Sequence, residues 1–110
     1  MSVPVGIRIR REARSLELTF DDGSIVSFPA ELLRVLVPML PGQNVLVAGK
    51  RLVSLLAAEP VGNYALCLRF SDGFDSGIYT WEFLAELGRE QRIRWRRYLR
   101  LLEEAGLSRD

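Results

Sequence analysis

The chain has 110 residues, of which 48% are hydrophobic, and a formal net charge of +1. This length fits one domain spanning residues 1–110, and the apolar content is too high for a disordered chain. The sequence contains no histidine, and Cys67 is its only cysteine. An internal disulfide is therefore excluded, and the commonest general acid–base group and transition-metal ligand are both missing. We expect no catalytic site, metal or cofactor, and a reducing, cytoplasmic location.

The first forty residues predict a strand, a hairpin and a short helix. Apolar and basic residues alternate over residues 5–11, which is typical of a half-buried strand. The next strand carries Leu16, Leu18 and Phe20, and Asp21-Asp22-Gly23 provides a tight turn before the return strand at 25–28. Pro29 then opens a short helix whose apolar face is formed by Leu32, Leu33, Val35 and Leu36 and which ends at Pro38 and Pro41.

The middle of the chain predicts two short buried strands, at residues 45–47 and 53–58. Both segments are short apolar runs without the spacing of an amphipathic helix. The segment Glu59-Pro60-Val61-Gly62-Asn63 is expected to break the chain before the following strand.

The last third of the chain repeats the pattern of the first. Leu66, Leu68 and Phe70 have the spacing of the earlier strand, and Asp72-Gly73 lies fifty positions after Asp22-Gly23. A return strand through Gly77 and Ile78 leads to a helix over 79–87 with Thr80 as N-cap, and a separate last helix is expected from about Glu90 to Glu104, before Gly106. We therefore predict an α+β fold with two β-hairpin–helix units around a mainly antiparallel sheet, plus a C-terminal helix. Chance similarity of two hairpins is the alternative to a true repeat.

Two motifs that suggest chemistry are better explained by turns. Gly49-Lys50-Arg51 resembles part of a phosphate-binding loop, but Asn44 and Arg51 occupy the positions of the first glycine and the hydroxyl residue. The paired carboxylates Asp21-Asp22 and Asp72 with Asp75 lie in predicted hairpin turns, where aspartate is common for conformational reasons. Cys67 lies within a strand and has no histidine to activate it.

Two further features leave alternatives open. Arginine alternates with aromatic and aliphatic residues over 92–100, which suits nucleic acid or an acidic partner but also the solvated face of a packed helix. Tyr79 and Trp81 follow a predicted turn; they form either a partner surface or part of the core.

Four sequence blocks carry a resemblance to a known family. They read Phe-Pro-Ala-Glu-Leu-Leu-Arg at 28–34, Ala-Gly-Lys-Arg at 48–51, Glu-Pro-Val-Gly-Asn-Tyr-Ala at 59–65 and Asp-Gly-Phe-Asp-Ser-Gly-Ile-Tyr-Thr-Trp at 72–81. In this order they resemble the gamma-butyrobetaine hydroxylase-like N-terminal domain family. The resemblance implies three contexts: a zinc-carrying domain before an oxygenase domain, a domain associated with Mrp-type P-loop carriers of iron–sulfur clusters, and a stand-alone bacterial domain without an established activity.

The sequence also departs from the family's pattern. Val37-Pro38-Met39-Leu40-Pro41 stands where the hydroxylases have cysteines, and Phe74 stands where stand-alone relatives have histidine. Zinc requires thiolates or imidazoles, so we expect the isolated protein to bind neither zinc nor iron.

These observations favour a non-catalytic adaptor that binds a partner protein, with an Mrp-type iron–sulfur carrier as the partner that the resemblance implies. The surface expected to bind it comprises Lys50, Arg51, Asp75, Tyr79 and Trp81. Two rival hypotheses are nucleic-acid binding through the arginine-rich last helix and a subunit role beside a separate 2-oxoglutarate-dependent oxygenase.

Overall fold

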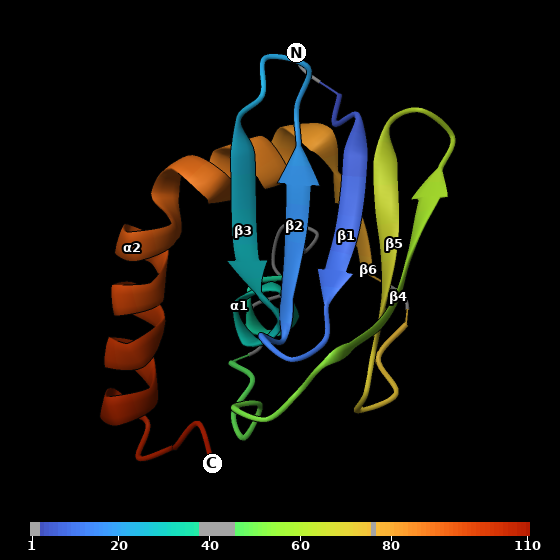
Figure 1. Cartoon of the computed structure of the whole chain (residues 1–110). Helices are drawn as coiled ribbons and strands as arrows, with labels where there is room; N and C mark the ends of the chain where they lie inside the picture. Colours follow the sequence, from blue (N-terminus) through green and yellow to red (C-terminus); the bar gives the residue numbers. More distant parts are fainter. Residues whose placement is uncertain (1–2, 38–45, 76) are drawn as a thin grey trace.

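The fold consists of two three-stranded antiparallel sheets and two helices. The computed structural model describes residues 3–37, 46–75 and 77–110. In the first sheet, β1 (Gly6–Arg10), β2 (Ser15–Thr19) and β3 (Ile25–Pro29) lie in chain order; in the second, β4 (Leu55–Val61), β5 (Ala65–Phe70) and β6 (Gly77–Thr80) do the same. Helix α1 (Ala30–Val35) follows β3, and helix α2 (Trp81–Glu104) follows β6 (Figure 1). The α+β class and the antiparallel pairing are confirmed, with the strands divided between two sheets.

The two units predicted from the sequence share detailed geometry. Leu16 is paired with Phe28 across β2 and β3, and Leu66 is paired with Tyr79 across β5 and β6. In both turns, an aspartate side chain accepts a backbone N–H two residues later: Asp22 Oδ1 from Ser24 N at 2.9 Å and Asp72 Oδ1 from Phe74 N at 3.1 Å. These local bonds explain why Asp-Gly occurs at both positions.

The start of each helix repeats as well. The backbone N–H of Ala30 donates to Arg14 O at 2.8 Å, and that of Trp81 donates to Tyr64 O at 3.1 Å. Thr80 is the N-cap of α2, as predicted, because its Oγ1 accepts the Phe83 N–H at 3.1 Å. The start of each helix is therefore bonded to the residue just before the first strand of its own hairpin, β2 or β5.

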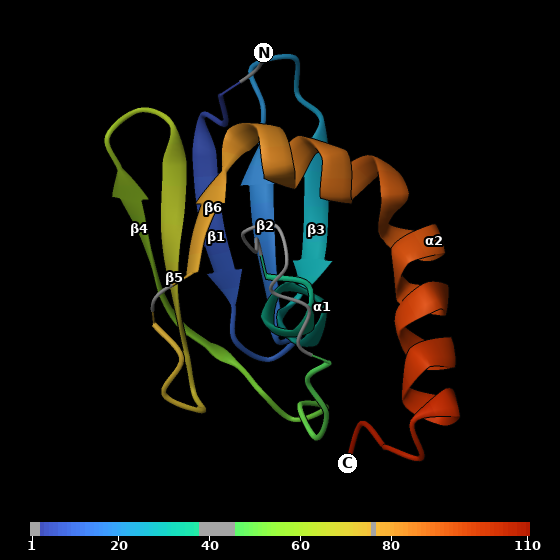
Figure 2. The same ribbon diagram turned by 180° about the vertical axis from the view of Figure 1, so that it is seen from behind.

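The prediction of two helices in the last third of the chain was wrong. Helix α2 continues through Gly88 for 24 residues and bends midway, so that its second half turns away from the sheets (Figures 1 and 2). A Cβ atom at Gly88 would lie 3.2 Å from Val26 Cγ1 on β3. The glycine therefore permits close helix–sheet packing and does not end the helix.

The middle of the chain also differs from the prediction. β4 continues through Glu59 and Pro60 to Val61, although the sequence predicted a break there. β4 is at the edge of its sheet, where a proline without an N–H is tolerated. The strand expected at 45–47 is not found at residues 46 and 47; Val45, like Pro38 and Pro41, lies outside the described residues.

One cluster of buried side chains joins both sheets and both helices. It includes Leu16, Leu18, Leu66, Leu68 and Phe70, each at most 1% exposed. The predicted inner face of the first strand is buried less well: Ile9 packs against this core, whereas Ile7 is 38% and Val5 is 68% exposed. β1 is an edge strand of its sheet, which leaves this face partly open. Within the described residues, no helix is sufficiently long and apolar to cross a membrane.

Candidate partner-binding groove

The predicted partner surface is divided by the structure, and its two aromatic residues belong to the core. Tyr79 is fully buried, and its hydroxyl donates a 2.6 Å hydrogen bond to Leu33 O at the end of α1. Trp81 is 7% exposed, and its Nε1 donates to Asn63 O at 2.9 Å. The interpretation of both residues as a partner surface was wrong, because each is needed to join the hairpins to the helices.

The three charged residues of the predicted surface are at the surface but serve different contacts. Lys50 Nζ lies 2.7 Å from Asp72 Oδ2, which also accepts a 2.7 Å hydrogen bond from Arg34 Nε. Arg51 pairs with Asp110 at 2.8 Å. Asp75 is exposed, and its backbone carbonyl accepts a hydrogen bond from Cys67 Sγ at 3.3 Å.

The Arg34–Asp72–Lys50 cluster is an electrostatic link between α1, the segment before β4 and the β5–β6 turn. Partial burial raises the pKa of Asp72, but hydrogen bonds from Lys50, the Phe74 N–H and Arg34 outweigh this effect and lower it to about 2. One carboxylate therefore satisfies two cations and a backbone donor. Its acceptor capacity is used within the fold, which favours a structural role.

The residues present do not fit the zinc site that the resemblance implies for the hydroxylases. Phe74, where the resemblance led us to expect a histidine in stand-alone relatives, lies under the Arg34 guanidinium, with 4.3 Å between its ring centroid and Arg34 Cζ. The sequence has no imidazole and one thiol, and the described part of the chain contains no group of three or more potential metal-ligating side chains. The Phe74 side chain is thus engaged in an aromatic contact to arginine and supplies no metal ligand.

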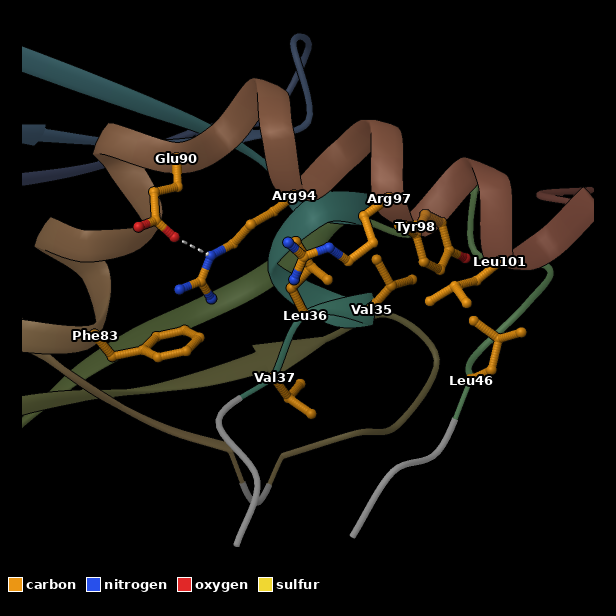
Figure 3. A pocket seen from close by; sticks show the side chains of 10 residues that line it. All are labelled: Val35, Leu36, Val37, Leu46, Phe83, Glu90, Arg94, Arg97, Tyr98 and Leu101. Carbon is orange, nitrogen blue, oxygen red and sulfur yellow. Dashed lines mark hydrogen bonds and ion pairs between the residues drawn. The ribbon is translucent and has the colours of Figure 1, made fainter. Parts of the chain in front are cut away.

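A groove of about 640 Å³ lies between α1 and the inner side of the bent helix α2 (Figure 3). Its volume is in the range of natural ligand pockets. Most of its lining is apolar and comes from Val35, Leu36, Val37, Leu46, Phe83 and Leu101. We call this the α1–α2 groove.

The bend of α2 creates the groove. Phe83 and Leu101 lie at opposite ends of it, although they are separated by eighteen residues, or roughly 27 Å along a straight helix. Arg94 stabilises the bend on the groove side, because its guanidinium pairs with Glu90 at 2.8 Å and with Glu86 at 3.3 Å. Glu86 precedes Gly88 and Glu90 follows it, so these contacts connect the two halves of the helix.

The rim of the groove carries positive charge. Arg97 is exposed and, within the described residues, has no carboxylate within ion-pair distance. Tyr98 is buried beside it and donates its hydroxyl proton to Val47 O; burial, followed by the charge of Glu31, raises the pKa of this phenol. The groove can therefore hold an apolar group and pair an adjacent anion, whereas its lining contains no nucleophile–base pair.

The sequence indicated parts of this groove but not the whole. The arginine-rich stretch was identified as unusual, and Val35 and Leu36 were assigned to the apolar face of the first helix. The groove itself depends on the bend at α2 and on the packing of α1 against it, which no local pattern contains.

The fold and the groove together define a small α+β domain with a largely apolar groove between its two helices. Comparison with known proteins gives the family: the sequence model for gamma-butyrobetaine hydroxylase-like, N-terminal matches residues 7–85, and the chain belongs to this family. No curated protein matches the chain.

Three solved structures resemble the chain closely. Two are NMR solution structures, 40% and 39% identical, each with a TM-score of 0.87; they cover 100% and 99% of this chain, and the chain covers 91% and 86% of theirs. The third is a crystal structure of a protein of unknown function of the DUF971 family from Acidithiobacillus ferrooxidans. It is 39% identical, with a TM-score of 0.68, and the match covers 78% of this chain and 92% of that one.

Proposed function

We propose that this protein is a non-catalytic accessory domain that binds a partner protein in the α1–α2 groove. The observation that supports this proposal is the combination of an apolar floor with the unpaired guanidinium of Arg97 at the rim. Buried apolar contacts surrounded by polar groups are the usual arrangement of protein interfaces, and arginine is enriched in them. The sequence has no imidazole, and the two acid–base groups that line the groove are already engaged within the fold: Glu90 pairs with Arg94, and the Tyr98 hydroxyl donates to Val47 O.

The charge of the rim defines the occupant that we propose. A partner segment with a large aliphatic or aromatic side chain next to an aspartate or glutamate fills the apolar floor and pairs with Arg97. Such a carboxylate does not need to displace a carboxylate already bound to that arginine. Arg94, which Glu86 and Glu90 already neutralise, contributes mainly to the shape of the groove.

The partner to test first is an Mrp-type iron–sulfur carrier, and the expected location is the cytoplasm. The family resemblance motivates this choice, and the groove provides the contact that such a complex requires. In this proposal the domain neither holds the cluster nor alters it; it recognises the surface of the carrier protein.

The experiment is calorimetric titration of the purified domain with a purified carrier of this type. Leu101 is 45% exposed at the end of the groove, so Leu101→Glu places a negative charge there without removing a core side chain. We expect this variant to bind at least tenfold more weakly. The matched control is Ile93→Glu, which makes the same kind of change at a 61% exposed position of α2 that does not line the groove.

The outcomes separate the parts of the proposal. If the natural domain does not bind the carrier, the choice of partner is wrong. If it binds and Leu101→Glu binds equally well, the groove is not the contact surface. Equal weakening by both variants assigns the effect to the charge of α2 and likewise contradicts the groove.

A further inference from the structure

The outer face of α2 carries a row of arginines that we call the arginine stripe. Arg89, Arg92, Arg96 and Arg100 follow one another at intervals of three, four and four residues, and all four are exposed. This spacing places them on one side of the helix, along roughly 16 Å. Tyr98 and Leu102, which face the core, are buried on the opposite side.

The arginines of the stripe form no ion pair within the described residues, unlike six other arginines of the chain. Arg10, Arg34, Arg51, Arg69, Arg94 and Arg109 each pair with a carboxylate. Among residues 3–37, 46–75 and 77–110, no carboxylate lies within 4.0 Å of the stripe's guanidinium groups. Glu86 and Glu90, the nearest acids along the sequence, both pair with Arg94, and Glu103 and Glu104 at the end of the same helix form no ion pair with the stripe.

The charge of the chain is strongly polarised toward this helix half. The segment from Gly88 to Leu101 contains six arginines and one glutamate, which gives it a charge of +5. Because the whole chain carries +1, the remaining residues carry −4. Such a separation costs electrostatic free energy through repulsion within the segment, and an external polyanion relieves that repulsion.

We propose that the arginine stripe binds the phosphate backbone of nucleic acid without reading its bases. Guanidinium groups form paired hydrogen bonds to phosphate oxygens, and every basic residue of the segment is arginine. An acidic protein is a poorer fit, because stable protein interfaces have an apolar centre and Ile93 is the one exposed aliphatic residue between these arginines. The positive charges of the stripe follow one another along the helix axis, as the phosphates of a nucleic-acid backbone do along its strand.

This site is independent of the α1–α2 groove. None of Arg92, Arg96 and Arg100 lines the groove, and Leu101 is turned by about 100° around the helix from Arg100. A groove variant and a stripe variant therefore test separate surfaces, and either proposal can fail while the other holds.

The test measures fluorescence anisotropy of a labelled DNA duplex of about 20 base pairs as the domain is added at increasing salt concentrations. Four neutralised phosphates predict a slope of about −3.6 in a plot of log K against log salt. The double variant Arg96→Gln/Arg100→Gln keeps good helix-forming side chains; we expect it to reduce the steepness by about 1.8 and to weaken binding at least tenfold near 50 mM salt.

The control is Arg8→Gln/Arg11→Gln, which removes the same charge from two exposed arginines at the β1–β2 end of the fold. We expect it to bind within about twofold of the natural domain. Equal weakening by both double variants would show a net-charge effect and overturn the proposal, as would an absence of binding near 50 mM salt. Equally tight binding of poly-glutamate at the same concentration of charges would assign the stripe to acidic polypeptides and also overturn it.

Discussion

The hydroxyl of Tyr79 provides a sharp test of the packing that joins the second hairpin to α1. The change Tyr79→Phe removes one oxygen and leaves the ring. In the natural protein this hydroxyl donates a 2.6 Å hydrogen bond to Leu33 O, and Tyr79 is 0% exposed. Leu33 lies near the C-terminal end of the six-residue helix α1, where carbonyl groups lack partners within the helix. The variant leaves this carbonyl buried without that partner.

The expected cost follows from the missing bond. A buried carbonyl left without a hydrogen bond costs about 1–3 kcal/mol, so we expect the free energy of unfolding to fall by about 2 kcal/mol. In a domain of this size, that loss lowers Tm by roughly 8 °C. Urea unfolding followed by the fluorescence of Trp81 and Trp95 measures it, with a midpoint shift of roughly 1 M. Burial raises the pKa of Tyr79, so its phenol is also expected to resist ionisation until the protein unfolds.

The matched control is Tyr64→Phe. Tyr64 is 53% exposed, so the same chemical change there is expected to alter stability by less than about 0.5 kcal/mol. If Tyr79→Phe is no more destabilising than Tyr64→Phe, the hydroxyl of Tyr79 does not hold α1, and the reasoning that places it in the core as a fixed contact is refuted.

Two further predictions concern the ion pairs. Folding lowers the pKa of Asp72 from 3.8 to about 2, so the contribution of its carboxylate to stability is complete above pH 4 and is lost as the pH falls through 2. In urea titrations, Asp72→Asn should lower the free energy of unfolding by about 1 kcal/mol at pH 7, a value that allows for solvent screening. Near pH 1.5 the same change should cost nothing. A constant difference over that range would contradict the assignment. Arg109 holds the 8% exposed Glu31 through bonds of 2.6 and 2.8 Å, so Arg109→Gln should cost about 2 kcal/mol. Arg51→Gln, which breaks the exposed pair with Asp110, should cost at most about 0.5 kcal/mol; equal losses would show that burial of Glu31 is irrelevant.

Much of the fold was predictable because its determinants are local. The alternation of Leu16 and Leu18, repeated in Leu66 and Leu68, predicted the strands, and the Asp-Gly pairs predicted the turns whose side-chain bonds the structure contains. The N-cap Thr80 was predicted for the same reason, because the cap and the N–H that it accepts are three residues apart.

The errors arose where a residue's role depends on distant neighbours. Gly88 has the sequence signature of a helix end, but the contact that explains it is with Val26 on β3. Tyrosine is common in protein interfaces, yet the hydroxyl of Tyr79 donates a hydrogen bond to Leu33 O, forty-six positions earlier in the chain. Local patterns contain neither contact. The α1–α2 groove was not predicted for the same reason.

The comparison of the two units indicates where function is most usefully sought. The hairpins, the aspartate-capped turns and the anchored helix starts occur in both units, so their residues are explained by folding. The units differ most in their helices: α1 has six residues and α2 has twenty-four. The additional length of α2 is not needed to hold the β5–β6 hairpin, because that hairpin contacts only the first turns of the helix. It provides the second half of the helix, which forms one wall of the groove and carries the stripe.

The family match ends at residue 85, whereas both NMR structures extend over this helix half. A variant of the domain that loses the arginines but keeps its stability is therefore expected to lose a function of this half, not the fold that the family shares.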